Sequence, residues 1–302
     1  MTKIIRDNLL ICVSGRKRVG KTHESVKQLL FHAYFANHKR KSLVFDVNNE
    51  LGSYSVDGTI HHIKKINHTE IIKYSNQEKI EVRRIVPIHD DGMMMNEDNV
   101  EKLLLKTIKE FRGGILMIDD LNLVFADAMP VKFSGMICNN AHRDCDLIIQ
   151  VQSSARLTPK LRQNINIIRF HHQLDDIDDS KGKLVGDYKI LKITQLMVNR
   201  SVKNGNMRFF IYINRDEGKI QGAFSPKMLA DAIKDFLLEN PSEMYSITQR
   251  RDEKGKKTYS FEEALKINAT AVPSIQKLVE SNAVKKYSNI GELLLTDSLK
   301  KE

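Results

Sequence analysis

Short apolar runs alternate along the chain with longer stretches in which apolar residues recur every three or four positions. The runs predict buried β-strands at residues 8–14, 41–46, 80–86, 115–118, 147–151 and 166–170. Helical spacing begins at His23 and returns over residues 99–111 and 129–141. Strands that alternate with helices predict an α/β fold, with a mostly parallel central sheet and helices on both faces.

Three further regions depart from this alternation. Residues 51–79 carry no regular apolar repeat and predict loops and short irregular pieces. Residues 209–224 predict a β-hairpin, and Pro226 predicts the first turn of a helix of about a dozen residues. The chain then becomes polar. We therefore expect a main domain over residues 1–225 and a small C-terminal extension over residues 226–302, which is helical and partly mobile.

Composition limits the class of protein. A chain of 302 residues can bury one α/β core and a smaller appendage. No apolar run reaches the roughly 18–20 residues that cross a bilayer, and residues 1–7 contain no secretory signal, so we expect no integral membrane segment. Cys12, Cys138 and Cys145 lack a metal-type spacing and form an odd set, which indicates a reducing, cytoplasmic setting.

The positive charge is unevenly distributed. The formal net charge is +10, of which +1 falls in residues 226–302 and +9 in residues 1–225. A basic main domain favours a polyanionic partner such as nucleic acid. Lysines that only improve solubility are the alternative.

Residues 15–22 match the phosphate-binding pattern G-x-x-x-x-G-K-[ST] and lie between a predicted strand and a predicted helix. In this P-loop, Lys21 is predicted to reach the β and γ phosphates of ATP, and Thr22 to offer its hydroxyl to Mg²⁺. A chance match in a turn is the alternative. The predicted nucleotide-binding residues are Gly15, Arg16, Lys17, Arg18, Val19, Gly20, Lys21, Thr22 and His23.

A second nucleotide motif follows at residues 114–120, where four apolar residues precede Asp119 and Asp120. A carboxylate at the end of a central strand can hold Mg²⁺, a role that we predict for Asp119. Asp120 is predicted to orient or deprotonate the attacking water. A strand that ends in an Asp–Asp turn is the structural alternative. A P-loop followed by such an acid pair predicts ATP hydrolysis.

Residues 44–50, 141–152 and 162–170 resemble the second strand with its terminal Asp and Glu, the strand that ends in glutamine, and the following helix and strand of HerA–FtsK ATPases. The likeness spans residues 8–225 and is strongest to the phage branch, which includes zonular-occludens-toxin-like proteins. It implies that Gln152 senses the γ-phosphate. Asp120 stands where the family often has Glu, and Ser153-Ser154 replaces the usual Arg-Pro, so the hydrolysis rate and the sensor loop can differ from the family's.

The resemblance implies a homo-oligomeric ring, often a hexamer, that moves DNA without sequence preference. The leading hypothesis is an ATP-hydrolysing DNA translocase for phage genome packaging or DNA transfer, in the host cytoplasm or on the virion. Viral structural proteins are further expected partners. Two hypotheses remain beside it: an assembly or secretion ATPase of the zonular-occludens-toxin-like kind, and a nucleotide-binding structural component of a virion with little turnover.

Three other clusters carry candidate chemistry. An arginine from a neighbouring subunit would stabilise the transition state; Arg143 is the first candidate, ahead of Arg169 and Arg156. Residues 175–179 hold four aspartates, which could bind a cation or begin a solvated helix, although their spacing matches no calcium loop. His171-His172 lacks the spaced partners of a known metal motif.

Overall fold

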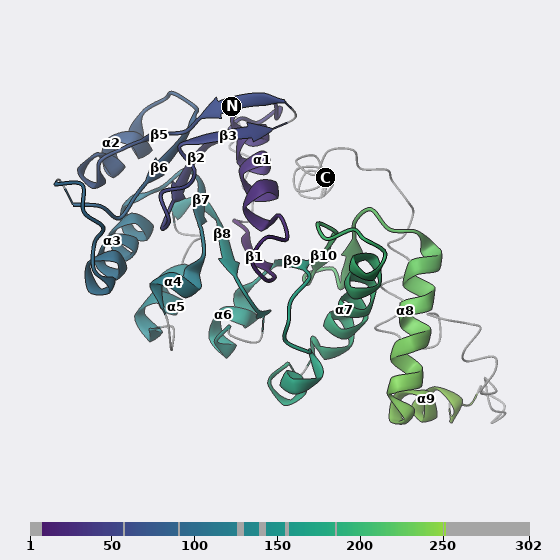
Figure 1. Cartoon of the computed structure of the whole chain (residues 1–302). Helices are drawn as coiled ribbons and strands as arrows, with labels where there is room; N and C mark the ends of the chain where they lie inside the picture. Colours follow the sequence, from purple (N-terminus) through teal and green to yellow (C-terminus); the bar gives the residue numbers. More distant parts are fainter. Residues whose placement is uncertain are drawn as a thin grey trace, which may run out of the picture. The chain divides into compact units, whose positions relative to one another are not determined.

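A six-stranded parallel sheet forms the centre of the first of two units into which the chain divides (Figure 1). The computed structural model describes residues 8–56, 58–89, 91–125, 130–138, 143–154, 157–184, 186–249 and 251. The first unit runs to Ile167 and the second begins at Ile168. The strand order of the first unit is β1–β8–β7–β2–β6–β5, and each neighbouring pair is parallel. Its strands are β1 (Leu10–Ser14), β2 (Lys41–Phe45), β5 (Lys64–Lys65), β6 (Val82–Ile85), β7 (Gly114–Ile118) and β8 (Cys145–Val151).

The central strands are buried along their whole length. Every residue of β1, β7 and β8 is buried, which explains why these strands appear in the sequence as continuous apolar runs. At the start of β7, a Cβ on Gly114 would lie 2.6 Å from the carbonyl oxygen of Lys41. Only glycine therefore lets β7 approach β2 at this point.

Helices cover both faces of this sheet, as predicted. Helix α1 (Lys21–Tyr34) connects β1 to β2, and this connection moves toward the β5 edge of the sheet. The helical connections from β6 to β7 and from β7 to β8 move toward the β1 edge instead. Right-handed crossovers therefore place them on the face opposite α1. There α5 packs against both α3 and α6. This second group comprises α3 (Glu97–Glu110), α4 (Leu121–Val124), α5 (Val131–Cys138) and α6 (Pro159–Asn164).

Helix ends follow capping residues more closely than apolar spacing. Helix α3 begins two residues before the predicted start, because the side chain of Asn96 accepts a hydrogen bond from the backbone N–H of Asn99. Of the helix predicted over residues 129–141, α5 accounts for Val131–Cys138; residue 129 and residues 139–141 lie outside the described residues.

The prediction of irregular structure over residues 51–79 is wrong for much of that segment. It contains the antiparallel hairpin β3 (Ser53–Val56) and β4 (Thr59–His62), the 3-10 turn η1 (His68–Glu70) and helix α2 (Ile71–Asn76). The hairpin packs on α1 through ring contacts of Tyr54 with His23 and of His61 with Tyr34. Because most of its side chains are exposed, it leaves no apolar alternation in the sequence.

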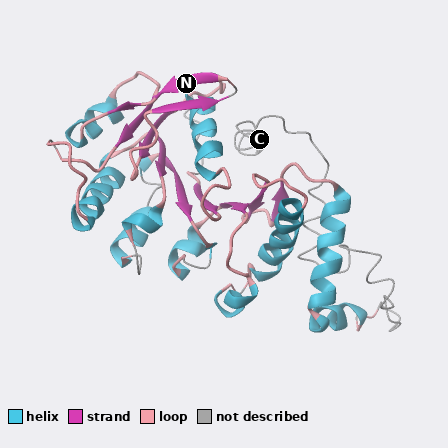
Figure 2. Ribbon diagram, viewed as in Figure 1, coloured by secondary structure: helices cyan, strands magenta, loops and turns pink. Residues whose placement is uncertain are grey.

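The second unit combines three strands with a pair of long helices (Figure 2). Strand β10 (Phe210–Asn214) lies between β9 (Ile167–His171) and β11 (Lys219–Gln221), and the predicted hairpin is β10 with β11. Helix α8 (Pro226–Glu239) begins at Pro226, as predicted, with Ser225 as its N-cap. It packs against α7 and α9. The remaining elements are η4 (Asp178–Lys183), α7 (Tyr188–Lys203) and α9 (Pro241–Thr248).

The predicted boundary at residue 225 falls between β11 and α8, inside the second unit, and stays a prediction. Most of the predicted C-terminal extension, residues 252–302, lies outside the described residues.

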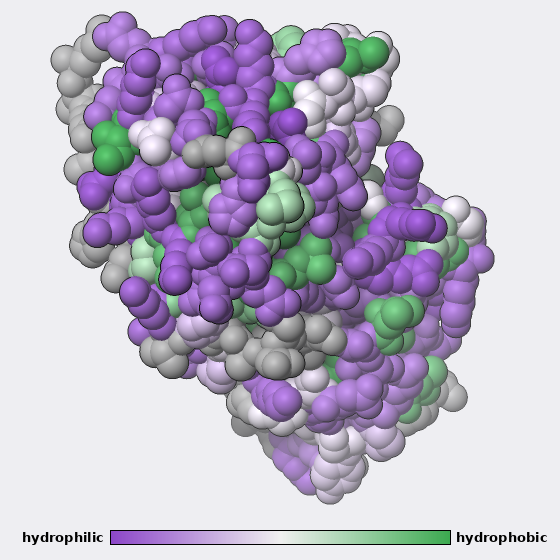
Figure 3. Space-filling view, turned by 60° about the vertical axis from the view of Figure 1, so that its left-hand side comes forward, coloured by the Kyte–Doolittle hydropathy of each residue, from purple (hydrophilic) through white to green (hydrophobic). Residues whose placement is uncertain are grey.

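Hydrophilic side chains cover most of the face shown in Figure 3, with hydrophobic residues in small groups among them. Within the described residues, no helix combines the length and hydropathy needed to span a membrane.

Candidate functional site

The predicted P-loop connects β1 to α1 at the carboxyl edge of the sheet. Within it, Arg18 and Gly20 adopt left-handed backbone conformations, with φ of 66° and 89°. Such residues turn successive N–H groups toward a common centre, which favours an anion. Helix α1 begins at Lys21 without a side-chain cap, so the N–H groups of its first turn also face the loop. The backbone of residues 15–23 therefore forms a cradle for phosphate groups.

The ammonium group of Lys21 lies over this loop. It donates hydrogen bonds to the carbonyl oxygens of Gly15, at 2.6 Å, and Arg16, at 2.9 Å. Both carbonyls belong to the P-loop itself. The charge of Lys21 is thus already held where phosphate oxygens are predicted to bind.

Thr22 and Asp119 meet at the end of β7, as the two motifs predict. The hydroxyl Oγ1 of Thr22 lies 3.1 Å from Oδ1 of Asp119 and 3.3 Å from Oε1 of Gln150. The backbone N–H of Asp119 donates to the carbonyl of Phe45 in the neighbouring strand β2, which fixes the position of the acid. Hydroxyl and carboxylate oxygens are hard ligands of the kind that Mg²⁺ prefers.

The electrostatics of Asp119 favour an added cation. Its side chain is only 5% exposed. Burial raises the pKa of this carboxyl to about 6; Asp46 and Asp120 act in the same direction, and the hydrogen bond from Thr22 opposes them. A bound divalent cation would offset both the cost of desolvating the charged carboxylate and its repulsion by Asp46 and Asp120. No group of three His, Cys, Asp or Glu residues suited to a metal occurs in the described part of the chain.

Asp46, at the end of β2, serves the fold. Its two carboxylate oxygens accept the backbone N–H groups of Glu50 and Leu51, at 3.1 and 3.0 Å. Nη1 of Arg84 completes the arrangement with an ion pair to Asp46 at 2.8 Å. The element that resembles the family's second strand is therefore a braced turn, and its carboxylate has a cation of its own.

Asp120 and Gln152 lie together beside Asp119. Nε2 of Gln152 lies 3.5 Å from Oδ1 of Asp120, so the predicted water-activating acid and the predicted phosphate sensor are neighbours. Asp120 has a φ of 43°. This left-handed conformation is uncommon outside glycine and is often found at functional sites.

The other predicted P-loop residues differ in exposure. Lys17 and Arg18 are exposed, Arg16 is half-buried and Val19 is buried. The ring of His23 lies 5.7 Å from that of Tyr54 in the β3–β4 hairpin. The roles of these residues in nucleotide binding stay predictions.

The arginine candidates occupy different positions. Arg143 precedes β8 at the amino edge of the sheet, opposite the P-loop, and its Nη2 donates to the carbonyl of Met136 at 2.7 Å. Its own chain therefore keeps Arg143 away from the nucleotide loop, and its role as an arginine from a neighbouring subunit stays a prediction. Arg169 is buried in β9, with its guanidinium over the ring of Phe210. Arg156 lies outside the described residues.

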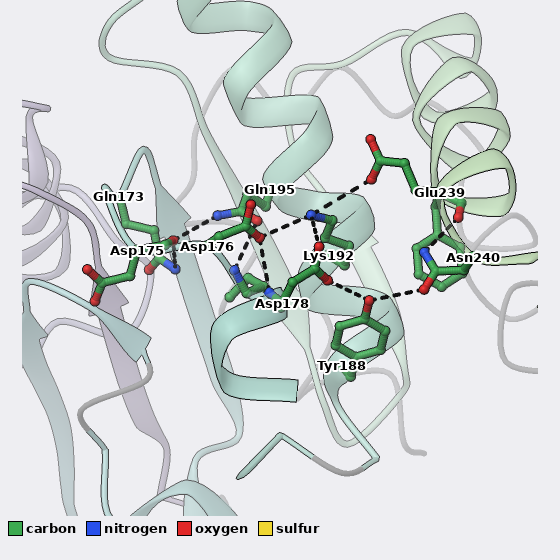
Figure 4. Close-up of polar contacts among 11 residues, drawn as sticks. Gln173, Asp175, Asp176, Asp178, Tyr188, Lys192, Gln195, Glu239 and Asn240 are labelled. Atoms are coloured by element: carbon green, nitrogen blue, oxygen red, sulfur yellow. Dashed lines mark hydrogen bonds and ion pairs between the residues drawn. The ribbon is translucent and has the colours of Figure 1, made fainter. Parts of the chain in front are cut away.

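Two of the four aspartates in residues 175–179, Asp176 and Asp178, form ion pairs with the side chain of Lys192 (Figure 4). Nζ of Lys192 lies 3.0 Å from Asp176 and 2.6 Å from Asp178. The hydroxyl of Tyr188 donates to Asp178 at 2.6 Å. The sequence allowed a cation site or a solvated helix start for this segment. The helix start fits in part, because η4 begins at Asp178. The nearby His172 contacts Asn199 through its ring.

Gln150 is the residue of the site that the motifs did not identify. It is 1% exposed, and its amide contacts both Thr22 and Ser25. A polar residue within a run of buried strand residues was the available signal, because a buried amide needs partners.

No protein-family model and no curated protein matches the sequence. Among solved structures, the genome packaging NTPase B204 from Sulfolobus turreted icosahedral virus 2, in complex with AMP, is similar. It has 16% identity and a TM-score of 0.46 over 71% of this chain and 96% of that chain. The N-terminal domain of zonular occludens toxin from Neisseria meningitidis shares 16% identity, with a TM-score of 0.31 over 54% and 76% of the two chains. The Legionella pneumophila ATPase DotB shares 9%, with a TM-score of 0.32 over 77% and 57%.

At these TM-scores the alignments are similarities only. The P-loop NTPase fold of this chain follows from its parallel sheet, its strand order and the loop between β1 and α1.

Proposed function

We propose that this chain is an ATP-hydrolysing DNA translocase of the HerA–FtsK type that acts in viral genome packaging or DNA transfer. The observation that carries the ATPase part is the direct contact of Thr22 with Asp119, with Asp120 and Gln152 beside them. A chance glycine-rich turn has no reason to place its threonine against a buried strand-end acid whose pKa is raised to about 6.

Each side chain has a role that its position supports. Mg²⁺, held by Thr22 and Asp119, would neutralise charge on the β and γ phosphates of ATP. Lys21 exchanges the carbonyls of Gly15 and Arg16 for phosphate oxygens. Asp120 accepts a proton from the attacking water, and Gln152 aligns that water with the γ-phosphate.

The DNA part rests on the sequence. Residues 1–225 carry a net charge of +9, and they contain the segments that resemble HerA–FtsK ATPases. A ring of subunits would also explain the position of Arg143, which lies at the sheet edge away from its own P-loop. In a ring, the guanidinium of Arg143 reaches the site of a neighbour and stabilises charge in the transition state.

The test is ATP hydrolysis by the purified chain with and without duplex DNA, with Lys21→Ala as the control. We expect turnover that DNA stimulates and that the control lacks. DNA binding should weaken steeply with salt, with a slope of roughly −0.9 in log K against log salt for each phosphate contacted.

Other outcomes select the other hypotheses. Turnover that ignores DNA favours an assembly or secretion ATPase. Nucleotide binding without turnover favours a structural component of a virion. Equal turnover by parent and Lys21→Ala would contradict the P-loop assignment itself.

A further inference from the structure

Two glutamines lie at the carboxyl end of β8, Gln150 within the strand and Gln152 directly after its last residue, Val151. Gln150 contacts Thr22, whereas Gln152 contacts Asp120. The two amides thus reach the two chemical halves of the site, one beside the predicted metal ligands and the other beside the predicted water-activating acid.

Gln150 is held from both ends of its amide. Its Oε1 lies 3.3 Å from the hydroxyl of Thr22, and its Nε2 donates to the hydroxyl of Ser25 at 3.2 Å. Thr22 and Ser25 are three residues apart on the first turn of α1, and so lie on one side of the helix. Ser25 is fully buried and Gln150 is 1% exposed. The amide therefore clamps the first turn of the P-loop helix to the central strand.

This clamp decides where the hydrogen of the Thr22 hydroxyl goes. A hydroxyl has one hydrogen, and its oxygen can bind a cation only if that hydrogen points elsewhere. Two acceptors are within reach, Oδ1 of Asp119 at 3.1 Å and Oε1 of Gln150 at 3.3 Å. When Asp119 serves a cation, Gln150 is the acceptor that remains. A buried amide oxygen left without a donor is costly, so Gln150 holds the hydrogen firmly.

We infer that Gln150 is a positioning residue that orients the hydroxyl of Thr22 for Mg²⁺, and that the end of β8 supplies a metal-side amide, Gln150, whereas the residue position just beyond the strand supplies a water-side amide, Gln152. The inference rests on the proposed nucleotide site and concerns a residue outside its motifs. It predicts that substitutions of the two glutamines cause different defects although the residues are only two positions apart in the sequence.

The experiment measures the Mg²⁺ dependence of binding of a fluorescent, non-hydrolysable ATP analogue to the full chain, together with the affinity in EDTA. Gln150→Leu should raise the Mg²⁺ concentration at half-saturation about tenfold, the loss expected of one hydrogen bond. Its affinity for the analogue in EDTA should stay within about twofold of the parent, because the phosphate-binding backbone is unchanged. Gln152→Leu should keep the Mg²⁺ dependence of the parent and lose turnover.

A double-mutant cycle separates positioning from a general structural defect. In a Thr22→Val background the hydroxyl is absent, so Gln150→Leu should cause no further loss of Mg²⁺ affinity. Gln195→Leu in α7 is the matched control, since Gln195 is also a buried glutamine whose amide bonds the chain, at Ile177 and Asp175. It should lower thermal stability and leave Mg²⁺ affinity unchanged.

Ser25→Ala keeps the test decisive if Gln150→Leu does not fold. It removes the hydroxyl that accepts from Nε2 and should shift the Mg²⁺ dependence in the same direction, by about two- to threefold, because the amide of Gln150 then loses this contact. Mg²⁺ affinities of Gln150→Leu and Ser25→Ala equal to that of the parent would overturn the role of Gln150 alone. A parent that binds the analogue with no dependence on Mg²⁺ would overturn the proposed metal site, and this inference with it.

Discussion

The two units each contain a group of carboxylates, and the groups differ in whether the chain supplies the neutralising cation. In the second unit, Lys192 provides an ammonium within 4 Å of three carboxylates, 3.0 Å from Asp176, 2.6 Å from Asp178 and 3.8 Å from Glu239 (Figure 4). In the first unit, Arg84 pairs with Asp46, and the described residues place no ion pair on Asp119.

The pKa values move in opposite directions for this reason. Burial alone would raise the pKa of Asp178, but hydrogen bonds from Lys192 and Tyr188 outweigh it and lower the pKa. Burial raises the pKa of Asp119 to about 6; the hydrogen bond from Thr22 and the more distant charge of Lys21 oppose this rise without cancelling it. A group of carboxylates that pairs with a lysine or arginine of the same chain supports the fold. A buried carboxylate without one is suited to a cation that arrives with a ligand.

The largest difference is expected between Asp120→Asn and Asp178→Asn. Removal of the water-activating acid should lower ATP turnover by about 10²- to 10⁴-fold, with little change in ATP affinity. Asp178→Asn alters a carboxylate of the second unit and should leave turnover per folded molecule unchanged. Steady-state hydrolysis and analogue binding measure both effects. Normal turnover by Asp120→Asn would contradict the proposed role of Asp120 as the water-activating acid.

Lys192→Met tests the second group. It removes the shared cation and leaves the carboxylates unpaired; because these are about half exposed, the free energy of unfolding should fall by roughly 1–2 kcal/mol. Urea unfolding followed by circular dichroism measures this value. The control is Lys189→Met, which removes a more exposed lysine with a single carboxylate partner, Glu243, and should cost less than about 1 kcal/mol. Equal losses in the two variants would show that Lys192 is an ordinary surface lysine.

Asp119→Asn should raise the free energy of unfolding, whereas Lys192→Met lowers it. The raised pKa of Asp119 means that the ionised carboxylate destabilises the metal-free fold, by up to about 3 kcal/mol for a shift of some two units. Asparagine keeps an acceptor for Thr22 without the charge. We expect the free energy of unfolding of metal-free Asp119→Asn to exceed that of the parent by roughly 1–2 kcal/mol at pH 8, as measured by urea unfolding. A loss of stability would indicate that an unrecognised cation already neutralises Asp119.

The smallest effect is the pH dependence of this gain. Between its unfolded pKa of 3.8 and its folded pKa of about 6, Asp119 binds more protons in the folded state, so its contribution to stability decreases as pH rises through this range. The difference in melting temperature between Asp119→Asn and the parent should therefore grow from pH 4 to pH 6 and then level off. Asp178 has a lowered pKa, so its contribution is present above its unfolded value of 3.8 and is lost as pH falls further. A difference independent of pH would contradict the buried, unpaired state of Asp119.

The first group was largely predictable from sequence and the second was not. The P-loop has fixed residues because backbone geometry and phosphate charge require them, and Asp119 follows an apolar run that could only be a buried strand. Lys192 and its aspartates lie on different elements, and no spacing rule links them. Helix α7 escaped prediction, although Lys192 and Gln195 on it are buried and bind the loop around Asp176. Gln150 was missed because its partners, Thr22 and Ser25, are over a hundred residues away in sequence.

The backbone of Asp120 restricts which residues evolution can place there. At φ 43°, most side chains other than glycine strain the chain by about 1–3 kcal/mol, and asparagine and aspartate tolerate this conformation best. Glycine would relieve the strain, and asparagine would keep the conformation, but each removes the acid. Under the role proposed for Asp120, either substitution would abolish hydrolysis, so aspartate should persist only in lineages where hydrolysis itself is under selection.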